Sequence, residues 1–413
     1  MPSDTLEEFL SLPAAARPVL LEGRWLDESS GQSWAAAHPE DVLEGSGDKL
    51  AELPAWLDSQ ARRHPDGAAV GFFSYELARH LERLSLPTYS SLPDFSFAFY
   101  PHIERATVEV AAAPHPRGAI RIETPIDFQT FRTNVEKVRS YIAAGDIYQA
   151  NLTIPFSARV GGEPAEAIYR RMRCSGAPFR AFIKTPDRTI LSNSPERFFR
   201  VNSNHILTSP IKGTIARDRH CQQESRAALM ASEKDRAENL MIVDLLRNDL
   251  GRICDYSSIR AHLWQTEVLP QLLHLVSHVE GTLRPESGIL EIVKALFPCG
   301  SITGAPKIRA MQILAEIEQR PRGVSMGAIG IIHSTPGPDG GRMDFNVAIR
   351  TMVIERGTTT FNVGGGIVYD SDPAAEYDEV MLKAKPLFEA LGQEWRRTTD
   401  HGQLTTENQR RQL

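Results

Sequence analysis

Apolar residues recur at helical spacing in several stretches of the chain. In residues 128–144 they lie three or four positions apart, at Phe131, Val135, Val138 and Ile142, which predicts an amphipathic helix. Residues 233–248 predict the strongest helix, and further helices are predicted over 165–174, 306–317 and 374–391.

Short runs rich in β-branched and aromatic residues predict strands. Residues 70–77 indicate a strand that runs into a helix, and residues 95–100 and 107–112 predict the two strands of one antiparallel hairpin. Further strands are predicted over 147–156, 180–184, 188–192, 327–333, 345–354 and 359–363. Because the strands come in hairpin-like runs rather than in regular alternation with helices, we expect an α+β fold with antiparallel sheets.

The pattern divides the 413-residue chain into parts. Residues 1–115 form an N-terminal part that is rich in loops at its start, and 114–124 is a plausible seam. Residues 125–390 form the better-patterned second part. Residues 394–413 are polar, and we predict that this tail is disordered.

Composition and charge narrow the classes of function. Hydrophobic content of 41% and charged content of 24% are ordinary for a soluble globular protein. A net charge of −6 argues against a nucleic-acid-binding protein, which needs a basic face. We find neither an apolar run of membrane-spanning length nor a signal peptide at the start. The four scattered cysteines are typical of reduced thiols, so we expect a cytoplasmic location.

Lys212 is the most informative candidate for chemistry. It lies in Pro210-Ile211-Lys212-Gly213-Thr214, between a proline that lacks a backbone donor and a glycine that permits a tight turn. Its ammonium is either a solvated loop charge or a buried nucleophile. These five residues alone do not decide between the two.

Three groups of acidic residues are the next candidates. Glu196 follows a predicted strand and is either half of a surface pair with Arg197 or a general acid or base in a cleft. Glu238 and Asp244 lie on the helix predicted over 233–248 and form either a solvated face or part of a cation site. A second carboxylate source for Mg²⁺, which needs few protein ligands, is the last helix, with Glu376 and Glu379.

Two glycine-containing segments are candidates for binding an anion. Residues 299–307 open a helix but do not match the phosphate-binding P-loop pattern. Gly364, Gly365 and Gly366 follow a predicted strand, where they form either a flexible turn or a backbone nest for a carboxylate. Arg350, at the end of the preceding strand, can form a bidentate pair with the same carboxylate.

Taken in order, these segments resemble the chorismate-utilising enzymes. The resemblance covers nearly all of residues 128–387, and weaker similarity extends to 18–22 and 71–79. The matching stretches are 145–152, 194–198, 210–214, 235–249, 297–311, 349–351 and 364–385. The family's fold is antiparallel β-sheets packed as a sandwich with helices outside, and this is the fold that we expect.

The resemblance also implies roles for individual residues. Mg²⁺ and chorismate bind between the helices that carry Glu238 and Glu379, with Glu376 as a further metal ligand. The remaining implied substrate-binding residues are Thr214, Thr303, Gly304, Arg350, Gly364, Gly365, Gly366 and Lys383. Lys212 attacks C2 of the ring with loss of the C4 hydroxyl, ammonia then displaces the lysine, and Glu196 moves protons.

Within the family, Lys212 separates the activities. Members that make anthranilate carry alanine at this position, whereas lysine is typical of members that make 4-amino-4-deoxychorismate, for para-aminobenzoate and folate synthesis. Isochorismate and salicylate synthases have a water-activating lysine where this chain has Gln149. The alternatives are the large subunit of anthranilate synthase and a catalytically weak subunit that binds chorismate or tryptophan, because residues 20–22 resemble the family's tryptophan pocket.

Two departures from the family pattern concern the orientation of the substrate. Ser325 stands where many members have an aromatic residue, and residues 288–294 lack a histidine that many members are expected to carry there. None of the cysteines lies in a glutaminase-type nucleophile motif. We therefore expect a separate glutamine amidotransferase subunit to supply the ammonia.

Overall fold

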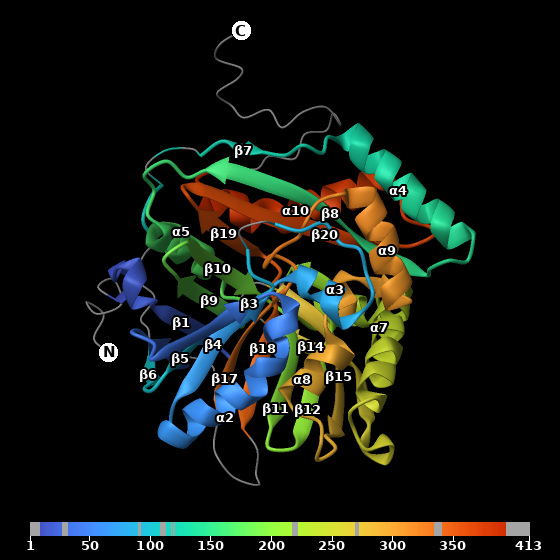
Figure 1. The fold of residues 1–413 in the computed structure, drawn as a ribbon. Helices are drawn as coiled ribbons and strands as arrows, with labels where there is room; N and C mark the ends of the chain where they lie inside the picture. Colours follow the sequence, from blue (N-terminus) through green and yellow to red (C-terminus); the bar gives the residue numbers. More distant parts are fainter. Residues whose placement is uncertain are drawn as a thin grey trace.

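The structure is a computed structural model that describes residues 9–26, 32–89, 92–107, 113–116, 118, 120–216, 222–268, 272–333 and 341–393. Two large antiparallel sheets pack face to face, and helices cover the outer face of each (Figure 1). Buried residues of both sheets, among them Leu21, Phe72 and Ile329, form the core between them. The expected sandwich with helices outside is confirmed.

The first sheet contains ten strands. Its order is β16 (Gly304–Ala305), β8 (Gln149–Arg159), β20 (Thr358–Ile367), β19 (Thr351–Glu355), β10 (Arg188–Ser194), β9 (Phe179–Lys184), β1 (Val19–Gly23), β2 (Gln32–Ala36) and β6 (Glu104–Thr107), and β7 (Ile122–Glu123) pairs with β8.

The second sheet also contains ten strands. Its order is β13 (Ile211–Ala216), β15 (Leu272–Thr282), β12 (His205–Ser209), β11 (Arg197–Asn202), β18 (Arg342–Val347), β17 (Ala328–His333), β4 (Ala68–Phe73), β5 (Phe95–Tyr100) and β3 (Asp41–Gly45), and β14 (Arg260–Val268) pairs with β15.

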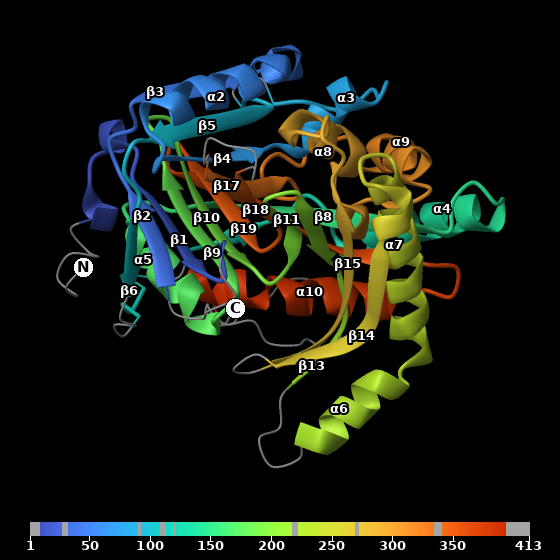
Figure 2. The ribbon, with the colours of Figure 1, turned by 90° about the horizontal axis from the view of Figure 1, so that it is seen from below.

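The helices divide between the two outer faces. The first sheet is covered by α4 (Phe128–Ala143), α5 (Ala165–Met172), α9 (Lys307–Glu318) and α10 (Pro373–Ala390). The second is covered by α2 (Leu53–Arg63), α3 (Ala78–Leu81), α7 (Glu233–Gly251) and α8 (Ile289–Leu296). Figure 2 shows α6 (Gln222–Ala231) at the edge, near β13 and β14.

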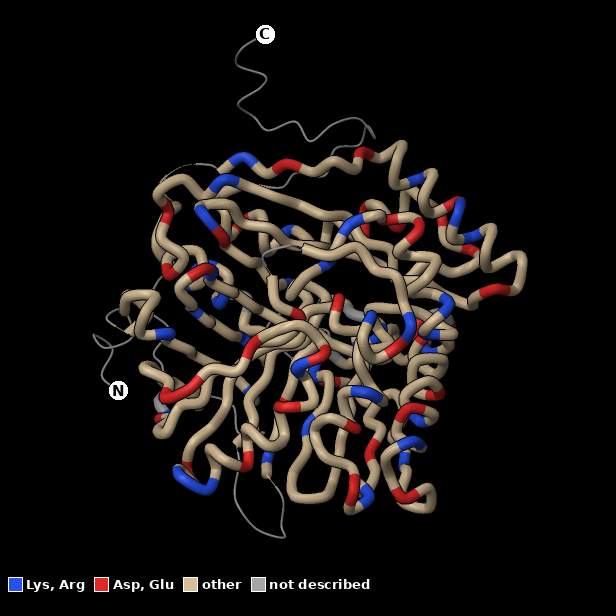
Figure 3. Tube along the Cα trace, viewed as in Figure 1, with Lys and Arg blue, Asp and Glu red and all other residues tan. Residues whose placement is uncertain are grey.

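Short 3₁₀ helices complete the described elements. They are η1 (Ala14–Ala16), η2 (Gly47–Glu52), η3 (Tyr75–Leu77), η4 (Arg173–Ser175), η5 (Tyr256–Ser258) and η6 (Gly300–Ile302). Lys, Arg, Asp and Glu are interspersed along the trace in Figure 3. Among the described residues, the longest helices are too short or too polar to cross a bilayer.

Side-chain caps explain where the main helices begin. Asp127 accepts a hydrogen bond from the backbone N–H of Thr130 at the start of α4, which is typical of an N-cap. Ser232 caps α7, and Asp372 caps α10 through the amides of residues 374 and 375. The predicted bounds of these helices are confirmed to within a few residues.

The hairpin predicted from residues 95–100 and 107–112 is wrong. β5 pairs with β3 and β4 in the second sheet, whereas β6 pairs with β2 in the first. Apolar alternation predicts a strand but not its partner, and the two strands lie on different sheets. Residues 108–112 and the tail 394–413 lie outside the described residues.

The single strand predicted over 345–354 is also wrong. It is divided into β18 of the second sheet and β19 of the first, and Arg350 at the corner has a left-handed φ of 50°. The N-terminal strands pair with strands of the second part, β1 with β9 and β4 with β17. The division at 115–125 stays a prediction about the sequence.

Candidate active site

A β-bulge in β13 positions Lys212. The register of β13 against β15 shifts between Ile211 and Thr214, so the residues between them are displaced from regular pairing. Gly213 has a φ of +87°, which favours glycine, and a Cβ there would lie 3.0 Å from the Asp235 side chain. Bulges commonly re-aim side chains beside active sites.

Lys212 is not a solvated loop charge. Its Nζ lies 3.6 Å from Oε2 of Glu238 on α7, and the two side chains are only 14% and 16% exposed. By contrast, Asp244 further along α7 is 63% exposed and pairs with Arg247, so it belongs to the solvent face. Of the two carboxylates predicted on this helix, only Glu238 faces Lys212.

Glu196 is a buried carboxyl group and not half of a surface pair. Arg197 instead binds Asp344 at 3.1 Å, and Glu196 is 4% exposed. Burial raises the pKa of Glu196 to about 7, although a hydrogen bond from Ser301 and the charge of Lys212 both lower it. Its Oε1 has no hydrogen-bond partner among the described residues. A carboxyl group in this state can both accept and donate a proton near neutral pH.

The three glycines lie inside β20 rather than in a turn after it. Gly364 pairs with Thr153 and Gly366 with Asn151 in regular antiparallel register with β8. A Cβ on Gly366 would lie 2.4 Å from Nε2 of Gln149 and 3.4 Å from Nζ of Lys212. The absence of a side chain therefore lets Gln149 and Lys212 approach the same stretch of backbone.

Gln149 is a buried amide that sequence reasoning used only to exclude other activities. It is fully buried, and neither Oε1 nor Nε2 has a hydrogen-bond partner among the described residues. Unpaired buried polar atoms cost stability, and both atoms of this amide remain able to form hydrogen bonds.

Helix α10 brings three predicted residues to the same strand. Oε2 of Glu376 would lie 3.5 Å from a Cβ on Gly365, and its Oε1 accepts a hydrogen bond from Ser371 at 2.7 Å. Nζ of Lys383 donates to the Gly364 carbonyl at 3.3 Å and pairs with Glu379 at 2.7 Å.

The carboxylates of α7 and α10 fit a hard cation in their chemistry. Glu238 and Glu379 each lie against a lysine ammonium, at 3.6 and 2.7 Å, so both carboxylates face positive charge. Within the described parts of the chain, no three His, Cys, Asp or Glu side chains gather closely enough to surround one metal ion. A magnesium ion held here would therefore rely on few protein oxygens and on its own waters, as is usual for Mg²⁺.

The loop before α9 contributes Thr303 and Gly304. The Thr303 hydroxyl donates to the carbonyls of Cys299 and Gly300 at 3.1 and 3.2 Å, so it stabilises the loop. Gly304 has a φ of +157°, and a Cβ there would lie 2.2 Å from the Gln149 carbonyl oxygen. Thr214 pairs with His274 in the β13–β15 register, and its side chain lies outside the described set.

Arg350 faces a histidine that sequence reasoning missed. His274 on β15 is 1% exposed, and burial and the Arg350 charge lower its pKa to about 4. Burial also lowers the pKa of Arg350. The family pattern places an imidazole near residues 288–294, where this chain has none, whereas His274 is a neutral imidazole on β15. The alternating pattern around His274 marks a strand, and only the sheet pairing shows that it lies opposite Thr214.

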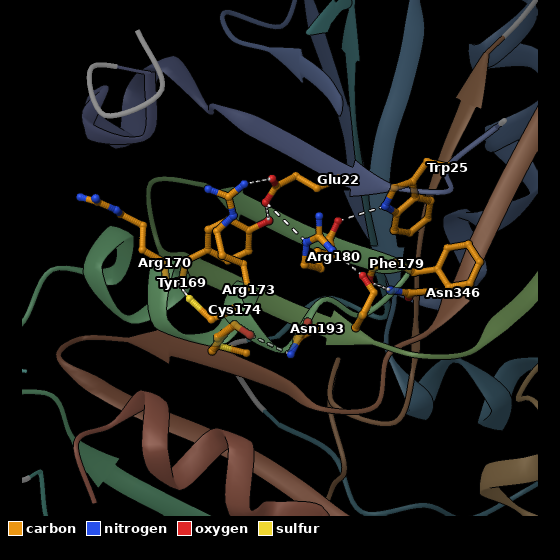
Figure 4. Close-up of polar contacts among 12 residues, drawn as sticks. Glu22, Trp25, Tyr169, Arg170, Arg173, Cys174, Phe179, Arg180, Asn193 and Asn346 are labelled. Atoms are coloured by element: carbon orange, nitrogen blue, oxygen red, sulfur yellow. Dashed lines mark hydrogen bonds and ion pairs between the residues drawn. The ribbon is translucent and has the colours of Figure 1, made fainter. Parts of the chain in front are cut away.

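The carboxylate of Glu22 is bound by three side chains of the same protein. Tyr169 donates to Oε2 of Glu22 at 2.6 Å, Arg173 pairs with Oε1, and Nε of Arg180 lies 3.8 Å from Oε2 (Figure 4). Trp25 donates to the Arg180 carbonyl at 3.0 Å beside this cluster. The tryptophan-binding alternative stays a prediction.

Comparison with known proteins agrees with this geometry. A family model described as "chorismate binding enzyme" matches residues 24–389. The chain superimposes on anthranilate synthase component I from Streptococcus pneumoniae with a TM-score of 0.75 and 28% identity, covering 87% of this chain and 92% of that one. The chain belongs to the chorismate-binding enzyme family.

Within this family, aminodeoxychorismate synthase component 1 accounts for several relatives. That of Klebsiella aerogenes is 35% identical over 396 residues, which cover 87% of both chains. That of Bacillus subtilis is 33% identical and covers 86% of this chain and 84% of its own. The chain is a homologue of aminodeoxychorismate synthase component 1.

Proposed function

We propose that the chain converts chorismate and ammonia into 4-amino-4-deoxychorismate and water through a covalent intermediate on Lys212. The observation that carries this proposal is the half-buried Lys212, which lies on a bulge 3.6 Å from Glu238 and whose charge acts on the buried carboxyl group of Glu196. The activity in the names of the homologues supports the same reaction.

The first half of the reaction joins the enzyme to the ring. Ionised Glu196 first accepts a proton from the Lys212 ammonium. Nζ of Lys212 then attacks C2, the ring double bond shifts, and the C4 hydroxyl leaves with this proton from Glu196 as water. The new secondary ammonium then returns a proton to Glu196. One proton therefore cycles on one carboxyl group, which requires a pKa near the working pH, and burial raises the pKa of Glu196 to about 7.

The second half releases the product. Ammonia attacks C4, the double bond shifts back, and Nζ of Lys212 leaves with a proton from Glu196. The new ammonium of the product then gives a proton to Lys212, which restores the Lys212 ammonium and the Glu196 carboxylate. Two displacements place the amine on the face that the hydroxyl occupied. The side-chain amide of Gln149 is unpaired at both Oε1 and Nε2 and lies beside Gly366, with Nε2 nearest, so it can donate and accept hydrogen bonds in this part of the site.

The remaining residues hold the dianionic substrate. Arg350 and the backbone of Gly364–Gly366 would bind a carboxylate. The helices bearing Glu238 and Glu379 would hold Mg²⁺, with Glu376 as a further oxygen ligand. When bound, the ion neutralises negative charge between these carboxylates and the substrate.

The test is product identification with purified chain, chorismate, MgCl₂ and ammonium chloride. We expect 4-amino-4-deoxychorismate, which a separate lyase then converts into para-aminobenzoate. Direct formation of anthranilate, which is fluorescent, would contradict the proposal. This alternative is tested because anthranilate synthase component 1 of Aquifex aeolicus is 38% identical over 65% of this chain.

A further inference from the structure

A single buried guanidinium group joins the elements that form the floor of the candidate active site. Arg322 lies between α9 and β17, is 3% exposed, and donates from Nη1 to the Ile302 carbonyl at 2.8 Å. Its Nη2 donates to the Asn151 carbonyl at 2.7 Å. Two carbonyls from segments about 150 residues apart in sequence thus share one planar side chain.

Both carbonyls lie next to residues of the site. Ile302 lies between Ser301, which donates a hydrogen bond to Glu196, and Thr303. Asn151 is two residues beyond Gln149 on β8, so both side chains lie on one face of the strand. The backbone N–H of Asn151 in turn donates to the Thr303 carbonyl at 2.8 Å.

Glu318 completes the arrangement. Its two carboxylate oxygens accept from Nε and Nη2 of Arg322, each at 2.8 Å. Oε1 of Glu318 also accepts from the amide and the hydroxyl of Thr153 at 2.9 and 3.0 Å. Burial alone would lower the pKa of Arg322, but the Glu318 carboxylate raises it above its ordinary value, so the group stays charged.

The loop next to Arg322 needs such support. Thr303 has a φ of −115° and a ψ of −89°, which lies outside the regular helix and strand regions. The neighbouring Gly304 takes a φ of +157°. A backbone in unusual conformations persists when the surrounding structure holds it.

We propose that Arg322 is a positioning residue for the reaction, which fixes Ser301, Thr303 and Gln149 relative to one another by bonding the Ile302 and Asn151 carbonyls at once. This proposal rests on the proposed function for its catalytic consequence. Lysine cannot replace Arg322, because an ammonium lacks the planar set of donors that reaches two carbonyls and a carboxylate together.

The experiment compares Arg322→Lys with Tyr75→Phe in the full-length chain. Tyr75 is the matched control, because its ring lies 4.6 Å from the Arg322 guanidinium but its buried hydroxyl has no hydrogen-bond partner among the described residues. Hydrogen exchange of the ligand-free protein measures the exchange rates of two backbone N–H groups. That of Asn151 donates to the Thr303 carbonyl, and that of Thr153 donates to Glu318. Steady-state kinetics at fixed ammonia report kcat and KM for chorismate.

We expect Arg322→Lys to speed exchange in residues 149–153 and 300–305 and to raise KM for chorismate about tenfold, with a smaller change in kcat, because a slightly misplaced site binds less well. Tyr75→Phe should change neither. Unchanged exchange and unchanged KM, or a mere fall in the active fraction, would overturn the proposal.

Two further arms keep the test decisive. If Arg322→Lys does not fold, Glu318→Gln replaces it and should speed exchange at Thr153, because an amide accepts hydrogen bonds less strongly than a carboxylate. If exchange there stays unchanged, the proposal fails. If the wild-type chain makes no product from chorismate, the proposed function fails, and the exchange result alone then decides whether Arg322 positions this loop.

Discussion

In the proposed mechanism, a single carboxyl group, that of Glu196, performs the acid–base chemistry. Burial raises its pKa to about 7. If Glu196 accepts the proton that Lys212 loses, it must be ionised before the attack, so the rate should fall as Glu196 becomes protonated. We therefore expect kcat/KM for chorismate, measured at constant free NH₃, to decline below about pH 7.

Two variants check this assignment. Glu196→Gln should lose at least about 90% of the activity, since general acid–base catalysis typically contributes a hundredfold or more. The decline of kcat/KM at acidic pH should disappear in the same variant. Ser301→Ala removes the hydrogen bond that lowers the pKa of Glu196, so the decline of kcat/KM should move to higher pH. If the decline stays at the same pH in both variants, it arises from the titration of another group.

The stability of the protein should report the same pKa without any substrate. A raised pKa means that folded Glu196 binds a proton between its ordinary value near 4.3 and about 7, so its contribution to stability is lost as pH rises through this window. Glutamine does not titrate. The difference in Tm, Glu196→Gln minus wild type, should therefore be larger at pH 8 than at pH 5, and an equal difference at both would argue against the raised pKa.

At the scale of elements, β20 is shaped by missing side chains. A Cβ on Gly366 would lie 2.4 Å from Gln149, whereas one on Gly365 meets nothing closer than Glu376 at 3.5 Å. We expect Gly366→Ala to reduce kcat/KM at least about tenfold, because it displaces Gln149 and crowds Lys212. Gly365→Ala should have a clearly smaller effect, and equal losses would count against this geometry.

In the proposed function, helices α7 and α10 carry the carboxylates that would hold the cation. We expect turnover to require Mg²⁺, and we expect Glu238→Gln and Glu379→Gln each to raise the Mg²⁺ concentration for half-maximal rate about tenfold, because a neutral amide oxygen attracts a hard cation less than a carboxylate does. Asp244→Asn on the solvent face of α7 is the control. Full turnover in excess EDTA would contradict the expectation.

The elements show what a sequence pattern can and cannot predict. Periodic apolar residues located α4, α7 and α10 to within a few residues, because local interactions determine helices. Strand partners depend on distant residues, so β6 was paired wrongly and the corner at Arg350 was missed. His274 was not predicted as a neighbour of the site, because only the pairing of β13 with β15 places it opposite Thr214.

At the scale of the molecule, both sheets are built from both parts of the chain. β1 joins β9 in one sheet, and β4 joins β17 in the other. The two buried cysteines are poor candidates for glutamine hydrolysis, because burial raises the pKa of Cys299 to about 12 and that of Cys254 to about 11. A thiolate nucleophile requires a lowered pKa.

The raised pKa values of these two thiols lead to a prediction about the nitrogen source of the reaction. We expect the purified chain to use ammonium at pH 8.5, where more free NH₃ is present, and to use glutamine only with an added glutamine amidotransferase subunit. The component 1 naming of the homologues agrees with a second subunit. Product from glutamine with this chain alone would refute the need for a partner.

The central claim is that Lys212 becomes covalently bonded to the substrate. Its most direct test is mass spectrometry of the chain incubated with chorismate and Mg²⁺ without ammonia. We predict a mass increase of chorismate minus water on the peptide that contains Lys212, its disappearance on addition of ammonium, and at least a tenfold lower rate for Lys212→Ala, about 1.4 kcal/mol of transition-state stabilisation. No adduct, together with an unchanged rate for Lys212→Ala, would contradict the account.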